Sequence, residues 1–60
     1  MAAEEPVAVV EGPKGKAEIF EIWNGGRLIE YQVKYDGNSE TCVNIGDAYI
    51  TAGDKVGTKV

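Results

Sequence analysis

Two stretches of alternating apolar and polar residues, Lys16 to Trp23 and Leu28 to Tyr35, flank the sequence Asn24-Gly25-Gly26. Asparagine and glycine tolerate the positive φ that a tight hairpin turn requires, so the chain is predicted to reverse there and form a β-hairpin. A turn centred on Asn24-Gly25 is preferred, because a turn one residue later sets two glutamates opposite each other, which is destabilising.

Either turn predicts the same two faces for this hairpin. Moving the turn by one residue shifts the cross-strand partner of each residue by two positions, and residues two apart on a strand share a face. The core-facing side is expected to be mainly aromatic and β-branched: Phe20, Ile22, Ile29, Tyr31, Val33 and Tyr35. The opposite side is expected to combine charged or polar residues, Glu21, Glu30, Gln32 and Lys34, with Ala17, Ile19, Trp23, Leu28 and, on the next strand, Cys42.

Shorter elements are predicted on both sides of the hairpin. The segment Pro6 to Glu11 is β-branched and reads as an edge strand that Gly12-Pro13-Lys14-Gly15 ends. A three-residue loop at Asp36-Gly37-Asn38 is expected to lead into a strand from Glu40 to Ile45. That loop keeps Val43 opposite Tyr31 and Ile45 opposite Ile29, whereas two-residue closures place Glu40 and Cys42 on the core side.

The carboxy-terminal part of the chain carries a helical pattern. Ile45, Ala48, Tyr49 and Ala52 follow the spacing of an apolar helical stripe, with Asn44 as N-cap, Asp47 in the first turn and Gly53 as stop. The sequence thus predicts an α+β fold: an antiparallel meander of three to four strands with one short carboxy-terminal helix packed on its Phe20/Tyr31/Val33 face. The alternative is a hairpin from Tyr49 to Val60, which would give an all-β, SH3-like small barrel.

Size and composition limit what such a chain can do. Its 60 residues suit one shallow core, predicted over residues 6–60 after a disordered tail at 1–5. The formal charge of −4 disfavours binding to nucleic-acid phosphates. Neither a signal peptide nor a membrane anchor is apparent, and the single cysteine favours the cytoplasm.

No catalytic, metal-binding or cofactor-binding residues are predicted. Cys42 has no histidine to activate it, since the chain contains none. The oxygen-rich segment from Asp36 to Glu40 lacks the glycine at the sixth position of a calcium loop, where Thr41 stands. Gly12 to Lys16 lacks both the spacing and the hydroxyl of a phosphate-binding loop.

An apolar patch is the candidate functional feature. Trp23, Leu28 and Ile19 are expected on the sheet side away from the core, where either residues 7–10 or a partner must cover them. The preferred hypothesis is a small, acidic, non-enzymatic protein-interaction module that self-associates or binds a larger protein through this patch. The alternatives are an acidic nucleic-acid mimic that inhibits a nucleic-acid enzyme, and a small β-sheet module that binds nucleic acid through aromatic stacking.

Overall fold

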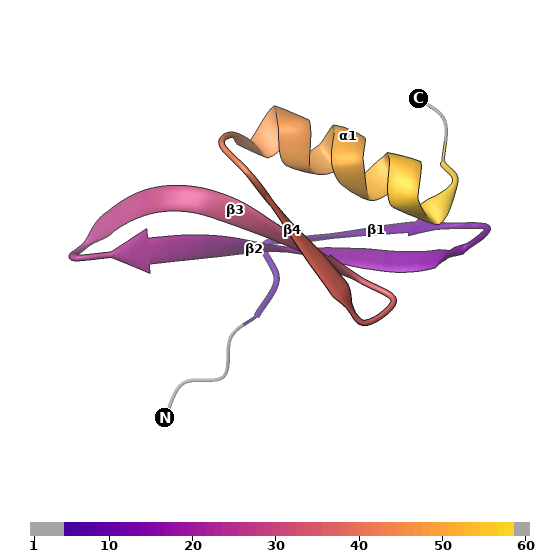
Figure 1. Cartoon of the computed structure of the whole chain (residues 1–60), viewed down its shortest axis with the longest axis horizontal. Coiled ribbons are helices and arrows are strands. Elements are labelled where there is room, and N and C mark those ends of the chain that lie inside the picture. Colours follow the sequence, from indigo (N-terminus) through magenta and orange to yellow (C-terminus); the bar gives the residue numbers. More distant parts are fainter. Residues whose placement is uncertain (1–4, 59–60) are drawn as a thin grey trace.

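A computed structural model describes residues 5–58 as a four-stranded antiparallel sheet with one helix on one of its faces (Figure 1). The strands follow one another in chain order and the helix comes last, which confirms the α+β meander and excludes the small barrel. The predicted tail at 1–5 lies outside the described residues, apart from Glu5. The elements are β1 (Ala8–Gly12), β2 (Gly15–Asn24), β3 (Arg27–Tyr35), β4 (Asn38–Cys42) and α1 (Ile45–Val56).

The central hairpin of β2 and β3 contains a β-bulge. Its turn is Gly25-Gly26 and not Asn24-Gly25, so the preferred turn position is wrong. Both glycines have positive φ, and Trp23 lies opposite Leu28. After the bulge, Ile22 lies opposite Glu30, so Ile29 is an extra residue on β3. Because of this extra residue, the odd-numbered residues of β2 beyond the bulge lie opposite odd-numbered residues of β3, whereas a hairpin without the bulge would pair odd with even.

The bulge overturns the predicted faces of β2. Ile19 lies opposite Val33 and Ala17 opposite Tyr35, so the odd-numbered residues of β2 face the helix. Ile19 is fully buried in the core, not on the outer side as expected. Phe20 is buried as predicted, but it lies opposite Gln32 on the face away from α1, with the Lys34 ammonium 4.9 Å from its ring centroid.

The predicted three-residue loop between β3 and β4 is also wrong. Asn38 lies opposite Tyr35, which leaves a two-residue turn in which Asp36 and Gly37 both have positive φ. Glu40 therefore lies opposite Val33 and Cys42 opposite Tyr31, the arrangement that seemed unfavourable because it places polar groups on the helix side. The Glu40 carboxylate is accommodated on the helix side because the Tyr35 hydroxyl on β3 and the Lys55 ammonium on α1 both contact it.

The helix begins where the sequence predicts and ends later. Asn44 has extended backbone angles, and its side-chain oxygen accepts a hydrogen bond from the Asp47 amide at 2.8 Å. This bond satisfies one of the free donors of the first turn. Gly53 does not stop the helix: it is buried in the last turns, and Gly57 forms the left-handed C-cap with φ of 82°.

The core lies between α1 and one face of the sheet. Its helical contribution is a row of small residues at intervals of four, ending in a valine, which lets α1 approach the strands closely. Tyr49 is exposed, so the predicted stripe is rotated on the helix surface. The buried cluster consists of Ala17, Ile19, Val33, Ala48, Ala52 and Val56.

Candidate interaction surface

The far end of the β2–β3 hairpin projects from the sheet as a two-stranded ribbon. β1 pairs with β2 only as far as Ile19, and β4 pairs with β3 only as far as Tyr31. Residues 21–30, which we call the hairpin arm, therefore have no neighbouring strand among residues 5–58. Figure 1 shows this ribbon extending past the start of α1.

Large apolar side chains remain exposed on the hairpin arm. Trp23 is 56% exposed, Leu28 opposite it is 38% exposed, and the bulge residue Ile29 is 48% exposed. The Trp23 indole Nε1 donates a hydrogen bond to a Glu21 carboxylate oxygen at 3.1 Å. Glu21 and Trp23 are two residues apart on one strand, so this bond helps to orient the indole before any partner arrives.

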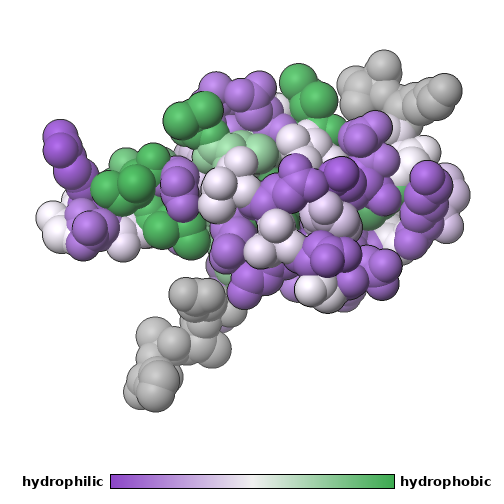
Figure 2. Space-filling model, viewed as in Figure 1, coloured by the Kyte–Doolittle hydropathy of each residue, from purple (hydrophilic) through white to green (hydrophobic). Residues whose placement is uncertain are grey.

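A second group of exposed apolar residues lies where β4 leads into α1. Val43 is 79% exposed, Tyr49 is 48% exposed and Ile45 is 36% exposed. Ile50, on the outer side of the helix, is 68% exposed. Figure 2 shows hydrophobic side chains gathered over the hairpin arm and again along α1, separated by polar ones.

Two of the three residues predicted to bind a partner lie on this surface. Trp23 and Leu28 lie opposite each other on the arm, but on the helix side of the sheet and not on the side away from the core as expected, because the odd-numbered residues of β2 face that side. Ile19 is in the core and has no exposed surface to offer. The alternative that residues 7–10 cover Trp23 is wrong, because Val7 bonds to the Ile19 carbonyl and β1 continues away from the arm.

Sequence reasoning missed Ile29 and Val43, which it placed in the core. Both predictions failed because the strand register differs from the expected one. Ile29 is the extra residue of the bulge, and the two-residue turn pairs Cys42 with Tyr31, so that Val43 lies beyond the end of β4. The adjacent glycines at 25 and 26 were the available signal for the turn position, since a two-residue hairpin turn with positive φ at both positions favours glycine.

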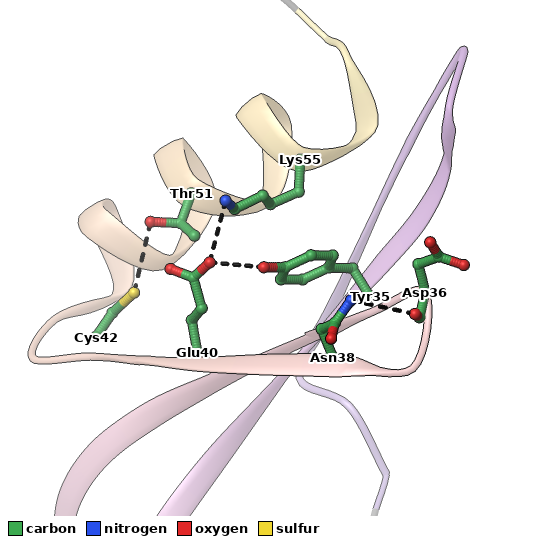
Figure 3. A network of polar contacts seen from close by, with 7 residues as sticks. All are labelled: Tyr35, Asp36, Asn38, Glu40, Cys42, Thr51 and Lys55. Atoms are coloured by element: carbon green, nitrogen blue, oxygen red, sulfur yellow. Dashed lines mark hydrogen bonds and ion pairs between the residues drawn. The ribbon is translucent and has the colours of Figure 1, made fainter.

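A polar cluster joins the other end of the sheet to the helix (Figure 3). The Tyr35 hydroxyl donates to a Glu40 carboxylate oxygen at 2.6 Å, and the Lys55 ammonium lies 3.1 Å from the same oxygen. The hydrogen bond from Tyr35, followed by that from Lys55, lowers the pKa of Glu40 below its usual value. The same carboxylate raises the pKa of Tyr35 and of Lys55.

The contacts in this cluster favour the ionised forms of both Glu40 and Lys55, because they lower the pKa of the carboxyl and raise the pKa of the ammonium. The carboxylate is held in its ionised form, so it is a poor general acid near neutral pH. A pocket of about 320 Å³ beside it is lined by Lys14, Lys16 and Lys55 together with Asp36, and the Lys55 ammonium is already paired with Glu40. Cys42 is half-buried, with its thiol 3.6 Å from the Thr51 hydroxyl.

Within residues 5–58, no group of three or more Cys, Asp or Glu side chains is arranged to hold a metal ion. In the same range, no helix is both long enough and apolar enough to cross a membrane. Comparison with known protein families, with curated proteins and with solved structures gave no match.

Proposed function

We propose that this chain is a small, acidic, non-enzymatic protein-interaction module whose hairpin arm docks onto another protein chain. The observation that carries the proposal is the exposure of Trp23 on a ribbon that no segment within residues 5–58 covers. The free thiol of Cys42 supports a reducing compartment, for which the cytoplasm is our proposal.

The arm has the properties of a pre-organised binding element. Its turn is formed by two glycines in the left-handed region, and its strands are already paired, so little backbone order must be gained on binding. Tryptophan is enriched among the residues that dominate binding energy, because it buries a large area and loses few rotamers. Leu28 and Ile29 would then form the apolar surroundings that exclude water.

The charge distribution of the sheet favours a protein partner over nucleic-acid mimicry. Glu18 lies directly opposite Lys34, and Lys16 lies next along the same face, so carboxylates and ammonium groups alternate there. A mimic of the phosphate backbone needs dense negative charge without interspersed cations. We therefore keep the mimic and the nucleic-acid-binding sheet as the less supported alternatives.

The test is direct binding after mutation of the arm. A protein recovered on the immobilised chain would be purified, and its affinity for wild type, Trp23→Ala and Val9→Ala measured by calorimetry. Val9 is the control because it is apolar and 46% exposed but lies on β1. We expect Trp23→Ala to weaken binding by at least thirtyfold, about 2 kcal/mol, and Val9→Ala to change it less than threefold.

Circular dichroism must show that Trp23→Ala keeps the wild-type fold. Equal affinities for wild type and a folded Trp23→Ala variant would refute the proposal.

A further inference from the structure

Within residues 5–58, one edge of the hairpin arm carries main-chain groups that no strand pairs, as well as apolar side chains. The Ile19 carbonyl accepts a bond from the Val7 amide, so the odd-numbered residues of β2 direct their main-chain groups towards β1. Main-chain groups alternate in direction along a strand. Those of Glu21 and Trp23 therefore point out of the same edge, beyond the point where β1 has ended.

We propose that the partner for this edge is a second copy of the chain, a proposal that rests on the proposed function. Two β2 edges would pair in antiparallel orientation about a two-fold axis at Ile22. Glu21 of each copy then lies opposite Trp23 of the other, so their amide and carbonyl groups can form four reciprocal hydrogen bonds. Such isologous pairing is the commonest form of homodimer symmetry, and strand addition is a recurrent mode of protein recognition.

The arm is self-complementary in this register. Each carboxylate of Glu21 already accepts a bond from its own indole and would lie beside the indole of the other copy, whose N–H end is positively polarised. An axis at Glu21 would set two carboxylates opposite each other, which is unfavourable. An axis at Trp23 would place Glu21 opposite the turn residue Gly25, at the end of the strand.

The surface requirement of a stable dimer also points to the arm. A specific interface buries about 600–800 Å² on each partner, roughly a sixth of the 4343 Å² that this chain exposes. The exposed edges of β1 and β4 lack an aromatic side chain to contribute to such an area. On the arm, the free edge is continuous with exposed Trp23 and Leu28.

Disulfide trapping tests the register. In a Cys42→Ser background, Ile22→Cys would place two thiols across the two-fold axis at a non-hydrogen-bonded pair, where Cα atoms are about 4.5 Å apart. Asn24→Cys is the matched control, because its two copies would be about 14 Å apart along the strands. We expect a covalent dimer for Ile22→Cys at least ten times as abundant as for Asn24→Cys. Equal or no crosslinking of both folded variants would overturn the proposed register.

Sedimentation tests the role of the edge. Glu21→Pro removes an amide hydrogen that points away from β3, which an edge strand tolerates. Val9→Pro is its control: the Glu11 carbonyl, two residues along β1, accepts a bond from the Thr58 hydroxyl outside the β1–β2 pair, so the Val9 amide faces the same outer edge. We expect wild type and Val9→Pro to dimerise with similar affinity and Glu21→Pro to associate at least tenfold more weakly.

A wild type that stays monomeric up to millimolar concentration would refute the dimer. If another protein still bound such a monomer through Trp23, the proposed function would stand and only the identity of the partner would be wrong. If Glu21→Pro were unfolded, the crosslinking comparison would still decide the matter.

Discussion

The β-bulge makes Ile19 and Ile29 a matched pair for testing the fold. They are the same residue type on adjacent strands of one hairpin, yet Ile19 is fully buried and Ile29 is 48% exposed. Without the bulge, the hairpin pattern would place Ile29 in the core and Ile19 outside. Shortening each side chain by one methylene, in Ile19→Val and Ile29→Val, should therefore give unequal losses of stability.

The expected losses follow from burial. Ile→Val in a core costs about 0.5–1.5 kcal/mol, and Ile19 should reach the upper part of that range because it packs against Val33 beneath α1. At Ile29, half of the side chain stays in water, so the loss should be about 0.3 kcal/mol. The milder substitution is preferred, because a chain of this size has only about 3–9 kcal/mol of stability and Ile→Ala could remove most of it.

Urea titration followed by far-ultraviolet circular dichroism is the appropriate assay. With an m-value near 1 kcal/mol/M for a small domain, Ile19→Val should lower the midpoint by about 1 M, and Ile29→Val by about 0.3 M. The protein concentration must be equal and low, so that self-association contributes equally to both variants. A loss for Ile29→Val equal to or larger than that for Ile19→Val would refute the bulged register.

Two further predictions concern the helix and the polar cluster. Asn44→Ala should destabilise the fold by about 1 kcal/mol in urea titration, because the Asp47 amide loses its cap; no change would show that the cap is unimportant. Glu40 has a folded pKa below its unfolded value, so its contribution to stability is present above the unfolded pKa and is lost as pH falls through the folded one. Tyr35→Phe should raise the pKa of Glu40 towards its usual value in a carbon NMR titration with Lys55 intact, and an unchanged pKa would contradict the assigned cause.

The elements of this fold could be predicted because their signals are local. The glycines at 25 and 26 permit a tight turn, and Asn44 followed by Asp47 is an N-terminal helix signature that the structure reproduces. The register could not be predicted, because it depends on tertiary contacts. A bulge residue leaves no clear mark in an alternating pattern, so Ile29 was assigned to the wrong face together with every residue of β2.

The length of the turn between β3 and β4 was predicted wrongly because it, too, depends on tertiary contacts. The rejected closure seemed to bury the Glu40 carboxylate, but Tyr35 and Lys55 both reach it at the margin of the core. Lys55 comes from a helix far along the sequence, so no local pattern could reveal that pairing. For the candidate site, Trp23 and Leu28 were identifiable from composition as large apolar residues. Alternation placed both on the wrong side of the sheet and placed Ile19 outside the core, because all three depend on the register.

Hydrogen bonds connect the end of α1 to the first hairpin of the sheet, which affects the order in which the fold can form during synthesis. The Lys14 amide bonds to the Val56 carbonyl, and the Thr58 hydroxyl bonds to the Glu11 carbonyl. Half of the buried cluster, Ala48, Ala52 and Val56, also comes from α1. While a ribosome synthesises the chain, the strands are therefore available before the residues that cover them. Until α1 has emerged, the sheet has an uncovered apolar face, so the core cannot be completed before residues 45–56 have left the ribosome.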